Sequence, residues 1–279
     1  VIPGPLTWLW LGKGDAFGGG AQDEGKLELL DALLPVYAEV LKRIAGLNVE
    51  WVQIDEPILT LDLPPAWRAA FARVYEHLAN TGVKLLLATY FDDLDDNLAL
   101  AAGLPVQGLH LDLVRAPGQL SPAVALLREA QVLSAGVVSG RNIWRTDLDK
   151  LGAVLAPIQK NLGDRLWLAP SCSLLHVPVD LAAEAELDPE LLSWLSFATQ
   201  KLDELRWLSL SLSGEPSAQA RDALQTQRRA LQARAQSRRI HSPVVQQRLR
   251  ESAQVSHNRE PFEQRIARQQ KQLKLPAYP

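Results

Sequence analysis

The sequence contains no methionine, not even at position 1, and it contains one cysteine, Cys172. Because translation begins at methionine and Val1 stands directly inside an apolar run, we expect residue 1 to be an interior position of a longer chain. A single cysteine cannot form an intrachain disulfide, and a free thiol is typical of a reduced, cytoplasmic setting.

Long apolar segments and a strong charge of either sign are also missing. No run of about 18 apolar residues occurs, so we expect no transmembrane helix. The start of the chain lacks the basic lead-in and the small-residue cleavage site of a signal peptide. The formal net charge of −3 over 279 residues gives no overall attraction to nucleic acid or to a membrane. With 47% hydrophobic and 22% charged residues, the composition predicts a soluble globular protein with one large core.

The sequence does contain short aliphatic runs that alternate with longer segments in which apolar residues recur at helical spacing. The aliphatic runs cover residues 1–11, 50–55, 83–90, 108–113, 132–138 and 166–170. The helical segments cover residues 27–47, 65–80, 94–102, 122–129, 147–162 and 188–210. Six strand–helix units in series predict an α/β fold with a parallel sheet. Strands that are apolar at nearly every position are typical of sheets covered on both faces.

The ends of the strands distinguish two parallel-sheet architectures. An open doubly wound sheet usually carries a glycine-rich phosphate-binding turn after its first strand, and no such turn is present. Polar residues instead follow strand after strand, as at the ligand-binding face of a (β/α)8 TIM-type barrel. They are Asp55-Glu56, Tyr90 with Asp92, Asp112, Ser139 with Arg141, and Ser171-Cys172. We therefore predict an incomplete TIM-type barrel with about six of the eight strand–helix units, the missing pair lying before the first residue.

The last part of the chain has a different composition. Residues 221–274 contain thirteen Lys or Arg and four Asp or Glu, a local balance of +9, and helical spacing is present. We predict a partial amino-terminal barrel over residues 1–212 and a helical, basic extension over residues 213–279 that ends in a linker-like LKLPAYP. The charge could suggest nucleic-acid binding. Only one aromatic ring interrupts it, however, so we favour a solvated helical face packed along the barrel.

Asp55 and Glu56 are the candidate substrate-binding residues, because they stand where a barrel strand ends. Paired carboxylates can bind an amine or divide the roles of general acid and general base. The structural alternative is that Asp55 caps the following turn while Glu56 forms a salt bridge with a neighbouring strand end. We favour the structural alternative on the sequence alone.

Two further groups of residues could carry chemistry. Cys172 and His176, with His110 as a third ligand, could bind zinc, or the cysteine and a histidine could form a nucleophilic pair. A buried thiol and hydrogen-bonded histidines are the favoured interpretation. Arg141 and Arg145, with Asn142 between them, could hold a carboxylate or a phosphate. Ion pairs that tie the barrel rim together are favoured there.

Taken together, these segments resemble consecutive blocks of cobalamin-independent methionine synthase, from the third strand of its amino-terminal barrel to the end of that barrel. The blocks are GPLTWLWLGK, LLPVYAEVL, EWVQIDEPILTLDLP, KLLLATYF, LPVQGLHLDLV, LSAGVVSGRNIWR, PSCSLLHVPVDL and RRIHSPVVQQRL. The resemblance covers nearly the whole chain in the right order. The closing LKLPAYP is similar to the segment that precedes the family's carboxy-terminal catalytic barrel.

The resemblance implies a methyltransferase of methionine biosynthesis that moves a methyl group from 5-methyltetrahydrofolate polyglutamate to homocysteine without cobalamin. It implies that zinc and the catalytic residues belong to the missing carboxy-terminal barrel, which would be the partner of this chain. The present part would be structural and substrate-positioning, and inactive alone. Gln53–Pro57 is the counterpart of a segment whose Asp engages homocysteine in the other barrel, so the resemblance implies that Asp55 and Cys172 belong to a degenerate site. It assigns no metal ligand and no folate contact to this chain.

Two alternatives stay open. The chain could be a stand-alone, non-catalytic scaffold or binding protein on a decayed barrel, which an initiator methionine upstream and a stop codon after Pro279 would indicate. It could also belong to a barrel hydrolase that uses Asp55 and Glu56 as its acid–base pair.

Overall fold

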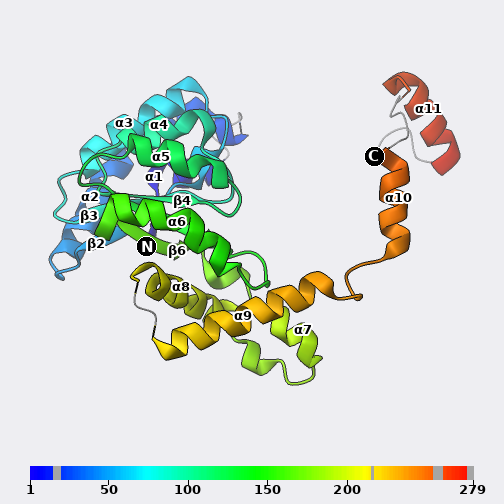
Figure 1. The fold of residues 1–279 in the computed structure, drawn as a ribbon. Helices are drawn as coiled ribbons and strands as arrows, with labels where there is room; N and C mark the ends of the chain where they lie inside the picture. The colour runs from blue at the N-terminus through cyan, green and yellow to red at the C-terminus, as the bar shows by residue number, and fades with distance from the viewer. Residues whose placement is uncertain (15–19, 215–216, 254–259, 275–279) are drawn as a thin grey trace. The chain divides into compact units, whose positions relative to one another are not determined.

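The computed structural model describes residues 1–14, 20–214, 217–253 and 260–274. It divides into two compact units, Val1–Leu231 and Gln232–Pro279. The first unit is built on a six-stranded sheet in which each strand pairs in parallel with the next strand along the chain (Figure 1). The strands are β1 (Ile2–Pro3), β2 (Trp51–Asp55), β3 (Lys84–Ala88), β4 (Gly108–Asp112), β5 (Val132–Val138) and β6 (Leu166–Pro170). This order confirms the predicted α/β fold with a parallel sheet.

Helices connect the strands. In the first unit they are α1 (Pro5–Leu11), α2 (Leu30–Ala45), α3 (Pro65–Leu78), α4 (Leu98–Gly103), α5 (Leu120–Leu126), α6 (Leu148–Leu162), α7 (Pro189–Trp194) and α8 (Ala198–Leu212). Local sequence signals set several of their starts: Pro65 stands in the first turn of α3, and the Asp147 side chain caps α6 by accepting the Lys150 N–H. No helix in the described ranges is long and apolar enough to cross a membrane.

The sheet curls into part of a barrel. Along β2, Val52 and Ile54 are buried in the core cluster that includes residues of α2 and α3, whereas the alternate residues face the other way. One of those, Trp51, contacts Trp167 of β6 with ring centroids 4.7 Å apart. Three strands separate β2 from β6 in the sheet order, so their side chains meet only because the sheet is strongly curved. The predicted TIM-type barrel with six strand–helix units is therefore present.

The beginning of the chain differs from the prediction of one strand over residues 1–11. The strand β1 has two residues, and α1 follows directly. Pro5 occupies the first turn of this helix, where its lack of an N–H costs nothing. The Glu56 side chain accepts the N–H groups of Leu6 and Thr7 in that turn. The predicted strand was wrong because Glu56, a residue distant in the sequence, caps these N–H groups and stabilises a helix. The apolar composition of residues 1–11 does not reveal such a cap.

The predicted single helix over residues 188–210 was also wrong, because it is divided into α7 and α8. The break lies at Leu195–Phe197, where Leu195 forms an antiparallel bridge with Trp144. The Ser196 N–H donates to the Ile143 carbonyl oxygen at 2.8 Å. Pairing with this distant segment takes the backbone hydrogen bonds that a continuous helix would have used.

The basic tail is helical, in agreement with its spacing. It contains α9 (Ala218–Gln236), α10 (Pro243–Ala253) and α11 (Phe262–Leu273). The compact division at Leu231 and Gln232 lies later than the predicted boundary between residues 212 and 213. The reason is that α9 buries Ala220, Leu224 and Gln227. Most of the predicted linker, residues 275–279, lies outside the described residues.

Candidate functional site

A cavity of about 570 Å³ opens beside the carboxyl ends of the barrel strands. Its polar lining comes from Gln53, Asp55, Tyr90, His110, Ser134, Cys172 and Ser173. A larger hollow of about 640 Å³ lies between α6, β6 and α8. That hollow follows the free edge of β6 instead of the strand ends, where ligands bind in barrels of this kind. We therefore take the smaller cavity, called here the Asp55 cavity, as the candidate site.

Strand register explains why these side chains converge. Asp55 is level with Ala88, Ala88 with His110, and His110 with Ser134. Residues that are level in a parallel sheet project from the same face. Gln53 precedes Asp55 by two residues and shares that face. The row therefore carries Asp55, His110 and Ser134 around the inner wall of the barrel.

Asp55 is a carboxylate held by neutral donors. The Gln53 amide donates to Oδ1 at 2.7 Å, and the Tyr90 hydroxyl donates to Oδ2 at 3.1 Å. Burial, and next the charge of Asp55, raise the pKa of Tyr90 well above its usual value, so this phenol stays protonated. No Lys or Arg in the described part of the chain forms an ion pair with Asp55. A cationic group entering the cavity would therefore find an uncompensated negative charge.

His110 is a neutral member of the wall. Its Nδ1 lies 2.9 Å from Ser134 Oγ, and its Nε2 lies 3.4 Å from the Ser171 carbonyl oxygen. A carbonyl oxygen only accepts, so Nε2 carries the proton and Nδ1 accepts the Ser134 hydroxyl. Burial lowers the pKa of His110, and the hydrogen bond to Ser171 and the nearby carboxylates of Asp112 and Asp55 oppose this shift. The imidazole acts as a fixed hydrogen-bonding group.

Cys172 reaches the cavity as a thiol. Burial is the main cause that raises its pKa, which keeps the sulfur protonated near neutral pH. Its neighbour is Gly140, where a Cβ would lie 2.9 Å from the sulfur and 2.6 Å from the Cys172 carbonyl oxygen. No group of three or more His, Cys, Asp or Glu that could hold a metal ion occurs within the described residues. These side chains therefore do not fit a zinc ion. The His176 ring contacts the ring of Phe91.

Glu56 points away from the cavity. It is fully buried and accepts the N–H of Thr7 at 2.7 Å, the N–H of Leu6 at 3.2 Å and the Tyr75 hydroxyl at 3.4 Å. Burial raises the pKa of Glu56 to about 7, against the opposing hydrogen bonds from Thr7, Leu6 and Tyr75. The two carboxylates thus have separate partners on opposite sides of the strand end. The structure does not bring Asp55 and Glu56 together as an acid–base pair, and their role in binding substrate stays a prediction.

The rim of the cavity carries the predicted arginine segment. The Arg141 guanidinium lies over the Phe91 ring, 4.8 Å from its centroid. The Asn142 side chain accepts the Trp144 N–H and shapes the loop. Arg145 is half-buried, and burial lowers its pKa while the charge of Glu204 opposes that shift. The ion pairs among the described residues include neither Arg141 nor Arg145, so the rim ion pairs favoured from the sequence are wrong for this part of the chain. Arg141 instead stacks on an aromatic ring.

Sequence reasoning missed Gln53, Ser134 and Phe91. The period of two along a strand could have found Gln53, because it shares a face with Asp55. Ser134 could be placed only through the register of β4 with β5. Phe91 has a positive φ of 88°, which nothing in its local sequence indicates.

Comparison with known proteins gives the family. The family described as "Cobalamin-independent synthase, N-terminal domain" matches residues 1–163, more than half of the chain. A methyltransferase from Methanosarcina mazei is similar at 18% identity and a TM-score of 0.42, over 54% of this chain and 43% of that one. A candidate vitamin-B12-independent methionine synthase from Listeria monocytogenes is similar at 13% identity and a TM-score of 0.45, over 69% of this chain and 56% of that one.

A candidate orotidine 5'-phosphate decarboxylase from Streptomyces avermitilis is similar at 18% identity and a TM-score of 0.36, over 61% of this chain and 64% of that one. The chain thus spans about half the length of the methyltransferase and methionine synthase structures that it resembles. The match over residues 1–163 carries the assignment. This chain belongs to the family of cobalamin-independent synthase N-terminal domains.

Proposed function

We propose that this chain takes part in the transfer of a methyl group from 5-methyltetrahydrofolate polyglutamate to homocysteine, giving methionine. Membership of the cobalamin-independent synthase family over residues 1–163 supports this activity. In this proposal the chain acts together with a carboxy-terminal catalytic barrel. Its own contribution is structural and substrate-positioning.

The Asp55 cavity carries the positioning role. Asp55 offers a carboxylate whose two hydrogen bonds come from the neutral donors Gln53 and Tyr90. A protonated amine would supply the missing positive charge and replace the water that solvates the free carboxylate. Because the cavity wall is otherwise uncharged, with His110 neutral and Cys172 a thiol, charge pairing with Asp55 would dominate the orientation of such a ligand.

Zinc enters the proposal only through the partner barrel. When bound there, zinc would hold the homocysteine sulfur as a nucleophilic thiolate at neutral pH. The described residues of this chain do not supply a ligand set for it. The residues of this chain bind and orient, and no proton or methyl group is moved by them.

The test is methionine formation by the full-length protein with Asp55→Asn, compared with the wild type. We expect the KM for the substrate that carries the amine to rise about tenfold, because one charge-assisted hydrogen bond is lost, while kcat stays within about twofold. The matched control is Asp62→Asn, which changes an exposed acid outside the cavity and should leave both constants unchanged. Absence of methyl transfer by the wild-type full-length protein would refute the proposed activity and favour the stand-alone scaffold.

A further inference from the structure

Phe91 has an unusual backbone conformation next to the Asp55 cavity. Its φ of 88° lies in the left-handed region that side chains other than glycine rarely adopt. The Phe91 N–H donates to Asp112 Oδ2 at 3.2 Å, and Asp112 is itself fully buried. The other oxygen of Asp112 accepts the N–H groups of Val114 and Arg115 at 3.1 and 2.9 Å. The end of β4 thus holds Phe91 in a conformation that its own preferences disfavour, and such strain points to a function for its side chain.

Two basic side chains contact the Phe91 ring. The Arg141 guanidinium lies over the ring at 4.8 Å, and the His176 ring meets it edge-on at 5.7 Å. Both side chains are exposed, and no acidic residue in the described ranges pairs with Arg141. Stacking on an aromatic face leaves the edge of a guanidinium, with its fork of N–H donors, free to bind. Tyr90, the chain neighbour of Phe91, and Leu175, the chain neighbour of His176, both line the cavity. Arg141 lies over the Phe91 ring, which places it beside the same mouth.

The loop that carries Arg141 is fixed at its near end. Ser139 Oγ accepts the N–H groups of Arg141 and Asn142 at 3.3 and 3.2 Å. Gly140 packs closely against Cys172, since an added Cβ would lie 2.6 Å from the Cys172 carbonyl oxygen. Arg141 is therefore held with little backbone freedom, so a ligand would not have to order it.

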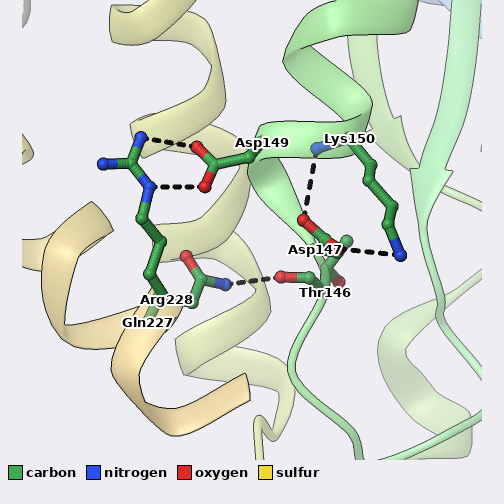
Figure 2. A network of polar contacts seen from close by, with 6 residues as sticks. All are labelled: Thr146, Asp147, Asp149, Lys150, Gln227 and Arg228. Atoms are coloured by element: carbon green, nitrogen blue, oxygen red, sulfur yellow. Dashed lines mark hydrogen bonds and ion pairs between the residues drawn. The ribbon is translucent and has the colours of Figure 1, made fainter. Parts of the chain in front are cut away.

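The far end of the same loop is held by two helices. The Trp144 carbonyl oxygen accepts a hydrogen bond from the buried Lys201 of α8 at 3.2 Å. Glu204 of α8 accepts the Thr146 N–H at 3.1 Å, and the Gln227 amide of α9 donates to the Thr146 carbonyl oxygen at 2.8 Å. Figure 2 shows this contact beside the pairing of the adjacent residue, Arg228, with Asp149 of α6. The loop that contains Arg141 is therefore held in place by the protein before any ligand binds.

We propose that Arg141 and His176, mounted on Phe91, form a binding site for a carboxylate group at the mouth of the Asp55 cavity. The amine contact of Asp55 rests on the proposed function, whereas the carboxylate contact stands on the rim residues alone. Together the two contacts select an amino acid that places its ammonium group inside and its carboxylate at the mouth. The planar fork of Arg141 matches the two oxygens of a carboxylate.

The surrounding charge favours a singly charged anion. Residues 1–231 contain 19 Lys or Arg and 29 Asp or Glu, a formal balance of −10, and Asp92 and Asp93 follow Phe91 directly. A phosphate, with nearly two negative charges, would be repelled about twice as strongly as a carboxylate at the same place. The site therefore takes carboxylates in preference to phosphates.

The test uses a series of unbranched ω-amino acids with two to six carbons, each paired with the alkylamine and the monocarboxylate of equal length. Their affinities for the full-length protein are measured by ligand-observed NMR. In the wild type we expect one amino acid in the series to bind at least tenfold more tightly than its matched alkylamine. Arg141→Gln should remove about tenfold of that affinity and leave the alkylamine unchanged, because a charge-assisted hydrogen bond is lost only at the carboxylate. Arg141→Lys should recover part of it.

The matched control is Arg206→Gln, which removes another exposed arginine stacked on a ring, that of Trp207 in α8. It should change none of the affinities. Equal affinities of Arg141→Gln and wild type for the amino acids and monocarboxylates, or tighter binding of inorganic phosphate, would overturn the carboxylate site, as would no detectable binding of any probe. Failure of Asp55→Asn to weaken alkylamine binding would instead count against the amine contact alone, so the two proposals fail separately.

Discussion

The stability of the first unit should fall as the pH rises toward neutrality, because Glu56 is a buried acid that has no cationic partner among the residues that the structure describes. Burial raises its pKa to about 7 in the folded protein, against 4.5 for an unperturbed side chain. Between these two values the folded state binds the proton and the unfolded state releases it. The folded state therefore binds more protons, and the free energy of unfolding decreases with increasing pH over this window.

The magnitude follows from the two pKa values. One pKa unit corresponds to about 1.36 kcal/mol, so ionised Glu56 costs the folded state about 3 kcal/mol above pH 7. Between pH 5 and pH 8 the change is about 2–3 kcal/mol, since part of the difference is already present at pH 5. Most of this cost is the removal of the carboxylate from water, which the N–H groups of Leu6 and Thr7 offset in part.

The measurement is urea unfolding of wild type and Glu56→Gln at several pH values between 5 and 8. The glutamine does not titrate, and it leaves one of the two N–H donors of α1 without an acceptor, which costs about 1–3 kcal/mol at every pH. The informative quantity is therefore the slope of the difference between the two proteins, in which all other titrating groups cancel. Glu56→Gln should gain about 2–3 kcal/mol relative to wild type from pH 5 to pH 8.

The control is Glu50→Gln, which removes an exposed acid paired with Lys84 and should give a flat difference. A flat difference for Glu56→Gln as well, within about 0.5 kcal/mol, would refute the assignment of Glu56 as a strained, buried cap. A slope of the opposite sign would mean that the folded protein stabilises the carboxylate.

Two further pairs of variants are compared by urea unfolding. One pair tests the packing around two glycines of the first unit, and the other tests the contacts that attach α9 to it. Gly136→Ala should destabilise the first unit by about 1–3 kcal/mol, because its Cβ would lie 2.6 Å from a carbonyl oxygen of β4. Gly152→Ala, which meets open space within α6, should stabilise it by about 0.5–1 kcal/mol, and an equal effect of the two changes would contradict this account. Gln227→Ala should cost about 1–3 kcal/mol, because it leaves the buried Glu204 short of a donor. Arg228→Gln, at an exposed ion pair with Asp149, should cost no more than about 1 kcal/mol. A larger cost for Arg228→Gln than for Gln227→Ala would contradict the role given to the Gln227 contacts in Figure 2.

The sheet could be predicted from the sequence because its signal is local. Strands β5 and β6 lie where continuous aliphatic runs placed them, and polar strand ends indicated a barrel. The errors occurred where a distant residue decides the local structure. Glu56 makes a helix of residues that read as a strand, and the bridge between Trp144 and Leu195 divides a segment that reads as one helix. Apolar spacing contains no information about such partners.

The site was predictable only in part, for the same reason. Position at a strand end correctly placed Asp55 and Cys172 beside one cavity. Alternation along the strand separates Asp55 from Glu56 and shows why adjacent carboxylates need not act together. The left-handed conformation of Phe91 depends on Asp112, which lies 21 residues later in the chain. The rim that Phe91 builds was therefore beyond sequence reasoning, although Arg141 itself was noticed.

The protonation states in the cavity suit recognition better than catalysis. A general acid or base works best when its pKa is near the working pH. Here burial moves the pKa values of Tyr90 and Cys172 upward and that of His110 downward, so each group is held in its uncharged form. Asp55 then supplies the charged side chain of the lining, and neutral donor and acceptor side chains surround it. Such a wall would fix the orientation of a charged ligand without transferring its protons, in line with the substrate-positioning role proposed for this chain.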